Sequence, residues 1–121
     1  MKIPGPDHPI TISPAAGRVR VTFNGETVAD SAHAKVLREA GYPPVFYIPR
    51  EDAAMTRLIR TATATHCPYK GDASYYSITV GGRTAVEAVW SYEAPFPAVA
   101  GIAGHLAFYP DRVDDISEEK T

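Results

Sequence analysis

Several chemically capable side chains lie close together in the segment Thr65 to Tyr76, THCPYKGDASYY. It contains the only cysteine of the chain, Cys67, and Lys70 follows three residues later. A thiol reacts as its thiolate, and a nearby cation favours that form. The spacing therefore suggests a nucleophilic or redox centre with Lys70 as the positive charge. Cysteine is also among the most buried residue types and is usually inert when buried, so a structural thiol is the alternative.

The same segment has the composition of a tight turn. Pro68 fixes φ and Gly71 can adopt a positive φ, so residues 68–71 predict a type I turn closed by a glycine bulge. Such a turn would present Tyr69 and Lys70 outward at the edge of a sheet. There Lys70 would offer a point charge to an anionic ligand, or would simply be a solvated loop lysine.

Other candidate site residues lie outside this segment. Arg18 opens the first predicted strand, and Glu39 could pair with Arg18 or Lys70, or act as a general base. Aromatic residues on predicted strands could line a pocket, although such rings are more often part of a core. These are Tyr47, Tyr75, Trp90 and Tyr92.

The first half of the chain contains the clearest strand signals. Residues 18–23 alternate, which places Val19, Val21 and Phe23 on one face. Asn24-Gly25 then predicts a type I′ turn and a β-hairpin that returns over residues 26–30. Residues 31–40 fit either a helix or a strand, and residues 45–48 form a short strand before Pro49.

The second half predicts one helix and three strands. Apolar spacing, acidic residues at the start and arginines at the end favour a helix over 51–62. Strands are expected over 75–80, 84–92 and 102–109, the first two joined by Gly81-Gly82. In the second of these, Val86, Ala88 and Trp90 should share a face.

Length and composition place these elements in one mainly β domain with antiparallel sheets and one short helix. The chain has 121 residues, of which 45% are hydrophobic and 21% charged. We expect an extended, proline-rich N-terminal arm over 1–16, a single β domain over 17–113, and an acidic tail over 114–121 that frays.

The same composition argues against several classes of partner. A net charge of −2 without a basic stripe disfavours nucleic acid. No apolar run approaches the roughly 20 residues that span a bilayer, and the N-terminus lacks a secretory signal, so we expect a cytoplasmic protein without a membrane partner. A single cysteine cannot build a thiolate zinc site, and the four histidines show no ligand spacing. We therefore expect no metal or cofactor.

Two motifs stand out as specific, C-P-Y-K-G-x-A-x-Y-Y and W-S-Y-E-x-P, within five longer stretches: Gly5–Ile12, Arg18–Ser31, Pro43–Met55, Thr65–Ser77 and Ala88–Asp114. On these stretches the chain resembles a bacterial family, domain of unknown function 427. The resemblance implies a compact domain of two antiparallel sheets, with the tent-like, Mss4-like architecture as one form of it, although this chain lacks the zinc-binding cysteine pairs of some such domains. The family is also labelled nucleotidyltransferase-like, but the Gly-Ser followed by Asp-x-Asp that is usual in nucleotidyltransferases is absent.

The leading functional hypothesis is a small-molecule-binding domain for an anionic or aromatic metabolite. Lys70 and Arg18 would hold an anionic group, and Glu39 would orient one of them. The walls would come from Tyr47, Tyr69, Trp90 and Tyr92. The alternatives are a cysteine-dependent enzyme that uses Cys67 with Lys70 and Glu39, a nucleotidyltransferase-like activity, and a homodimeric interaction module.

Overall fold

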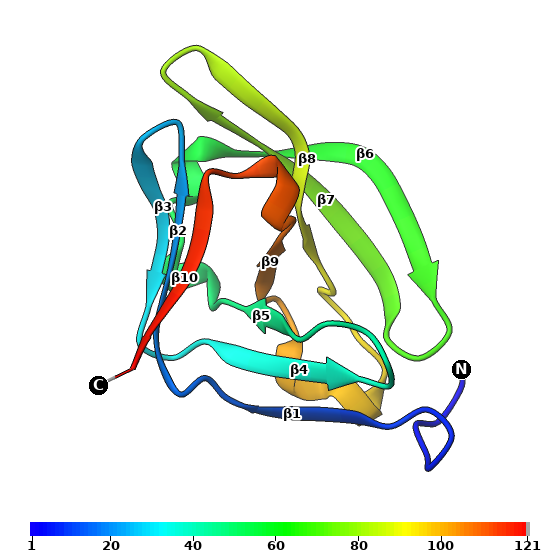
Figure 1. Cartoon of the computed structure of the whole chain (residues 1–121). Coiled ribbons are helices and arrows are strands. Elements are labelled where there is room, and N and C mark those ends of the chain that lie inside the picture. The colour runs from blue at the N-terminus through cyan, green and yellow to red at the C-terminus, as the bar shows by residue number, and fades with distance from the viewer. Residues whose placement is uncertain (121) are drawn as a thin grey trace.

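The computed structural model describes residues 1–120 and contains ten strands in three antiparallel sheets (Figure 1). The strand orders are β10-β2-β3, β1-β4-β5 and β6-β7-β8-β9. The expected class, mainly β with antiparallel sheets, is confirmed. The structure divides the strands among three sheets where the family resemblance implied two.

The predicted hairpin forms one of the three-stranded sheets. β2 (Gly17–Phe23) and β3 (Glu26–Ser31) flank a turn in which Asn24 and Gly25 have φ of 49° and 78°. These are the positive values that a type I′ turn requires. As predicted, Val19, Val21 and Phe23 share the buried face of β2.

The acidic tail completes this sheet instead of fraying. β10 (Asp115–Lys120) pairs antiparallel with β2 and places Ile116 opposite Val21. Ile116 packs against the main hydrophobic core, which gives the tail an apolar anchor that its overall charge concealed.

The second three-stranded sheet contains the ambiguous segment. β4 (Lys35–Glu39) is a strand between β1 (Ile10–Pro14) and β5 (Val45–Tyr47). β1 pairs with β4 over the whole of its length, so part of the proline-rich arm belongs to a sheet. Glu39 stands at the end of β4, opposite Ile10.

The helix predicted over 51–62 is wrong. Two short 3₁₀ helices, η1 (Arg50–Asp52) and η2 (Met55–Arg57), lead into the strand β6 (Leu58–Cys67). Thr61, Thr63 and Thr65 alternate along β6. Their branched Cβ atoms suit a pleated strand better than a helix, so the β preference of these residues prevails.

β6 opens the four-stranded sheet and turns through residues 68–70 into β7 (Gly71–Val80). β8 (Arg83–Ser91) follows across Gly81 and Gly82, which both have positive φ. The last expected strand is shorter, because η3 (Pro97–Ile102) precedes β9 (Leu106–Phe108). η4 (Pro110–Arg112) then leads to β10.

A backbone irregularity in β8 changes which side chains share a face. Val86 is exposed whereas Ala88 is buried, contrary to the alternation expected from the sequence. Glu87 between them has a φ of 50°, and the β7–β8 register shifts in this region. A residue of this conformation at a register shift interrupts the two-residue repeat of the strand.

The four-stranded sheet has a hydrophobic cluster on each face. Tyr76 and Val89 are opposite one another and belong to the larger cluster. The neighbouring pair, Tyr75 and Trp90, packs against the smaller cluster. Adjacent cross-strand pairs point to opposite sides of a sheet, so this register directs two aromatic rings away from the main core.

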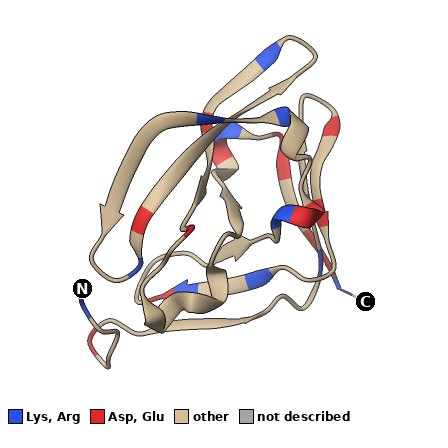
Figure 2. Ribbon diagram, turned by 180° about the vertical axis from the view of Figure 1, so that it is seen from behind, with Lys and Arg blue, Asp and Glu red and all other residues tan. Residues whose placement is uncertain are grey.

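Charged residues are distributed over strands of all three sheets (Figure 2).

Within residues 1–120, no helix is long and apolar enough to cross a membrane.

Candidate functional site

A cavity of about 530 Å³ lies between β4–β5 and β7–β8, beside the smaller hydrophobic cluster. Its walls combine aromatic rings and prolines with one ion pair and one thiol. The lining residues are Leu37, Glu39, Tyr42, Pro43, Pro44, Val45, Tyr47, Cys67, Lys70, Tyr75, Trp90, Tyr92, Tyr109 and Pro110.

Contacts among the rings organise the aromatic wall. Trp90 meets Tyr47 edge to face at 6.3 Å between ring centroids, and its Nε1 donates a hydrogen bond of 3.2 Å to the Tyr47 hydroxyl. The Trp90 ring also packs against Tyr109, with 4.5 Å between the ring centroids. Tyr75 stands opposite Trp90 in the sheet, and its hydroxyl is 2.9 Å from Thr65 Oγ1. These contacts link the aromatic wall to two sheets.

The polar end of the cavity is the ion pair between Lys70 and Glu39. The Lys70 ammonium group donates to Glu39 Oε1, and the two side chains are only 10% and 12% exposed. The prediction that the turn presents Lys70 outward is therefore wrong. Its backbone carbonyl is fixed by a hydrogen bond from the Phe96 amide, and its side chain points inward to the carboxylate.

A residue of the N-terminal arm, His8, also contacts this ion pair. His8 Nε2 lies 2.7 Å from Glu39 Oε2, so Lys70 and His8 engage both carboxylate oxygens. The Tyr69 ring stacks on His8 at 3.9 Å, with planes 7° apart. Partial burial acts to raise the pKa of Glu39, but the hydrogen bonds from Lys70 and His8 outweigh it and hold this pKa below its ordinary value. Glu39 is therefore a carboxylate at neutral pH.

Burial keeps the cavity tyrosines protonated. It raises the pKa of Tyr47 and Tyr92 well above the ordinary phenol value, because a phenolate would lose its hydration there. Burial, together with the neighbouring Tyr75 hydroxyl, raises the pKa of Tyr109 to about 12. These tyrosines present neutral O–H groups at physiological pH.

Cys67 is half-buried at the end of β6 and lines the cavity. The preceding residue, His66, is exposed and lies 2.7 Å from Asp72 through its Nδ1 atom. Lys70 lines the same cavity, and its ammonium group is bonded to Glu39. The cavity thus offers a thiol, an ion pair and several phenols, while within residues 1–120 no three His, Cys, Asp or Glu side chains gather as a metal site.

Two of the predicted binding residues lie away from the cavity. Arg18 on β2 bonds Asp30 at 2.5 Å, and Tyr69 lies outside the lining on the His8 side. The remaining predicted residues meet at the cavity, although their roles stay predictions: Glu39, Tyr47, Cys67, Lys70, Trp90 and Tyr92.

Sequence reasoning missed His8, Tyr42 and Tyr109. The proline on the C-terminal side of Tyr42 and Tyr109 is the one available signal, because proline ends regular structure and leaves the preceding side chain at a loop. Nothing in the local sequence links His8 to Glu39, since 31 residues separate them.

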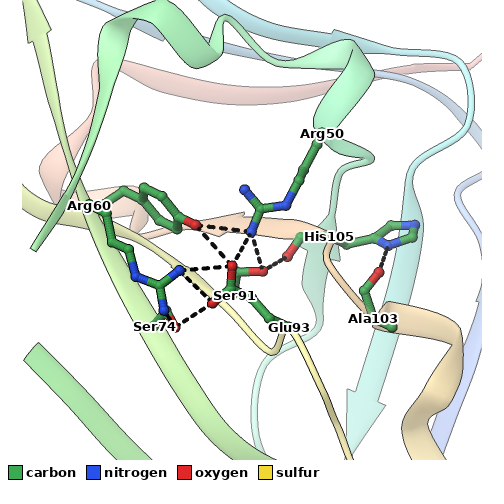
Figure 3. Close-up of polar contacts among 8 residues, drawn as sticks. Arg50, Arg60, Ser74, Ser91, Glu93, Ala103 and His105 are labelled. Carbon is green, nitrogen blue, oxygen red and sulfur yellow. Dashed lines mark hydrogen bonds and ion pairs between the residues drawn. The ribbon is translucent and has the colours of Figure 1, made fainter.

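A second polar cluster lies outside this cavity (Figure 3). Glu93 accepts hydrogen bonds from Arg50 at 3.2 Å and from Arg60 at 3.0 Å, and Ser74 donates to its other oxygen. Partial burial acts to raise the pKa of Glu93, but Ser74 and Arg60 outweigh it and lower this pKa. The remaining members are Tyr76 and Ser91, which both bond Arg50. This cluster fixes Ser91 and Glu93, the two neighbours of Tyr92 in the chain, and so helps to position Tyr92.

Comparison with curated proteins gave no significant match. Comparison with protein families gave a match over residues 11–119 to the family model described as domain of unknown function (DUF427). The match covers all ten strands except the first residue of β1 and the last residue of β10, and it includes the cavity-lining residues. The chain therefore belongs to the DUF427 family.

Proposed function

We propose that this domain binds a small aromatic or anionic metabolite in the cavity beside the Cys67–Gly71 turn. The observation that carries the proposal is an open, ring-lined cavity with a buried ion pair at one end. Its volume of about 530 Å³ falls within the range of roughly 300–1,000 Å³ that is typical of small-molecule sites.

The lining has the composition expected of a ligand site. Rings provide apolar contact area, whereas a few polar groups fix orientation. Here Tyr47, Trp90 and Tyr109 form the ring wall, and Lys70 with Glu39 forms the polar end. A planar ring would lie against the wall while its polar substituent reaches toward Lys70.

Energetics also support a ligand. A buried ion pair adds little net stability over apolar residues of similar size, and an open cavity leaves its apolar walls in contact with water. Neither feature gives the empty fold additional stability. A ligand that fills the cavity would cover the apolar walls and use the polar end for recognition.

Binding can be tested by a thermal-shift screen of aromatic acids, amides and nucleosides, followed by titration of the hits. Lys70→Met should weaken binding of the hits. Arg57→Met is the matched control, because Arg57 forms an exposed ion pair with Glu26 on another surface. If no compound raises the melting temperature, or if Lys70→Met binds the hits as well as the wild type does, the proposal is wrong.

A second candidate function is a cysteine-dependent reaction, favoured because Cys67 lines the same cavity as Lys70 and Glu39. The thiol would act as the nucleophile beside a bound substrate. This function requires iodoacetamide to modify Cys67 in the folded protein, and a bound ligand to slow that modification. Labelling only after denaturation would exclude it.

A further inference from the structure

The polar groups of the cavity differ in how much of their hydrogen-bonding capacity is already used. The Tyr92 side chain is 8% exposed and lines the cavity, and its hydroxyl has no hydrogen-bond partner within residues 1–120. No fully buried side-chain nitrogen or oxygen in this part of the chain lacks a partner. The Tyr92 hydroxyl is therefore in contact with the open space of the cavity.

Two further groups supply unused donors. An indole N–H can only donate, so the Tyr47 oxygen accepts from Trp90 and the Tyr47 proton is left for another acceptor. The Lys70 ammonium group has three N–H bonds, and one is directed to Glu39. Tyr92 and Lys70 present donors to one space, whereas Tyr47 is only 1% exposed.

The principal acceptor at this end is already occupied. One oxygen of Glu39 accepts from Lys70, and the other is paired with His8. A ligand with donors at its edge would share these two oxygens with Lys70 and His8, whereas a ligand with acceptors would use O–H and N–H bonds that have no partner. Unpaired polar groups in a buried site discriminate strongly between such ligands.

The charges limit the choice further. Lys70 and Glu39 carry opposite charges and cancel. A carboxylate ligand would leave water for a site where Lys70 is already paired with Glu39, and burying an uncompensated charge is costly. An uncharged acceptor avoids that penalty.

We propose, building on the function proposed above, that the cavity selects an uncharged planar ring whose edge carries carbonyl oxygen, as in an aromatic amide or a cyclic imide. The carbonyl oxygen accepts from Tyr92 and Lys70, and the ring lies against Trp90 and Tyr109. The Tyr92 hydroxyl is the specificity-determining group.

Four naphthalene probes with one ring system and different head groups test this proposal. They are 2-naphthamide, 2-naphthoate, 2-naphthylmethylammonium and 2-methylnaphthalene, and equilibrium dialysis measures each through its ring absorbance. The amide should bind tightest and the ammonium compound weakest. Tyr92→Phe should weaken amide binding by about three- to tenfold, which is the value of one neutral hydrogen bond. It should leave the affinity for 2-methylnaphthalene unchanged. Tyr69→Phe removes a hydroxyl outside the cavity and is the matched control.

The possible results separate this inference from the function on which it rests. If all four probes bind equally, or if Tyr92→Phe leaves amide binding unchanged, the cavity binds rings but the inference is wrong. If the carboxylate binds tightest, the site recognises anions and the inference is also wrong. If none binds at millimolar concentration, the inference is wrong, whereas the proposed function is decided separately by the thermal-shift screen described above.

Discussion

Replacing Lys70 with methionine should destabilise the fold, because it leaves the Glu39 carboxylate buried with one partner fewer. The two side chains are 10% and 12% exposed, so water replaces the lost ammonium group only in part. Removing one member of a fully buried pair costs about 3–5 kcal/mol. Glu39 keeps its bond to His8 and borders an open cavity, so we expect about 2–3 kcal/mol for Lys70→Met.

A double-mutant cycle isolates the interaction. Glu39→Gln alone leaves the Lys70 ammonium group without a carboxylate and should cost about 2 kcal/mol. The double variant buries no charge at this position, so it should be less destabilised than the sum of the single variants, by about 1–2 kcal/mol. Urea unfolding followed by the fluorescence of Trp90, the single tryptophan, measures all four proteins. Arg57→Met, which breaks an exposed pair, should cost under about 1 kcal/mol.

The same pair determines part of the acid sensitivity. The pKa of Glu39 in the folded protein lies below its ordinary value of 4.5, so its contribution to stability is complete above pH 4.5. This contribution decreases as the pH falls from about 4.5 through the pKa of the folded state. The stability difference between wild type and Glu39→Gln should therefore shrink over that interval. Strict additivity in the cycle, or a difference that is constant with pH, would refute the reasoning.

Three other changes test the fold. Asn24→Ala should cost about 1–2 kcal/mol, because Asn24 has a φ of 49°, which alanine disfavours, and donates a 2.9 Å hydrogen bond to the Val80 carbonyl. Asn24→Gly should cost less, because glycine accepts this φ and only the hydrogen bond is lost. Ile116→Ala should cost about 1–2 kcal/mol if the acidic tail packs on the core, and no change would contradict the pairing of β10. Arg60→Met should cost under about 1 kcal/mol, because the Arg60 side chain is 55% exposed. Urea unfolding measures each variant, and a larger loss for Arg60→Met would show that its cluster acts as a buried network.

Local signals predicted the elements whose geometry depends on a few adjacent residues. The Asn24-Gly25 turn is such an element, because its two positive φ values need particular residue types. The prediction of a helix over residues 51–62 was wrong, because the apolar spacing of this segment fits a helix while its threonines favour a strand. Pairing with β7 decided the outcome for residues 58–67, and a non-local contact of this kind is not visible in a local pattern.

The candidate site was only partly predictable for the same reason. Cys67 and Lys70 attracted attention by their types and spacing, and the structure places both at the cavity. Arg18 had an equally suitable type, but the hairpin register sets it beside Asp30. The partner of Lys70 is Glu39, which is 31 residues away, and only the assembled sheets bring the two together.

Tyr92 illustrates how a polar group can contribute little to folding and still serve binding. Its hydroxyl has no protein partner within residues 1–120 and is in contact with the open cavity, where water can hydrate it in the empty protein. Its removal should therefore cost the empty protein little stability. The same removal should weaken a ligand that carries a carbonyl oxygen. Burial of the Tyr92 ring alone would be served equally well by phenylalanine. A substitution that lowers affinity without lowering stability would assign the hydroxyl to recognition, and Ser91 and Glu93 on either side would then act by holding it in place.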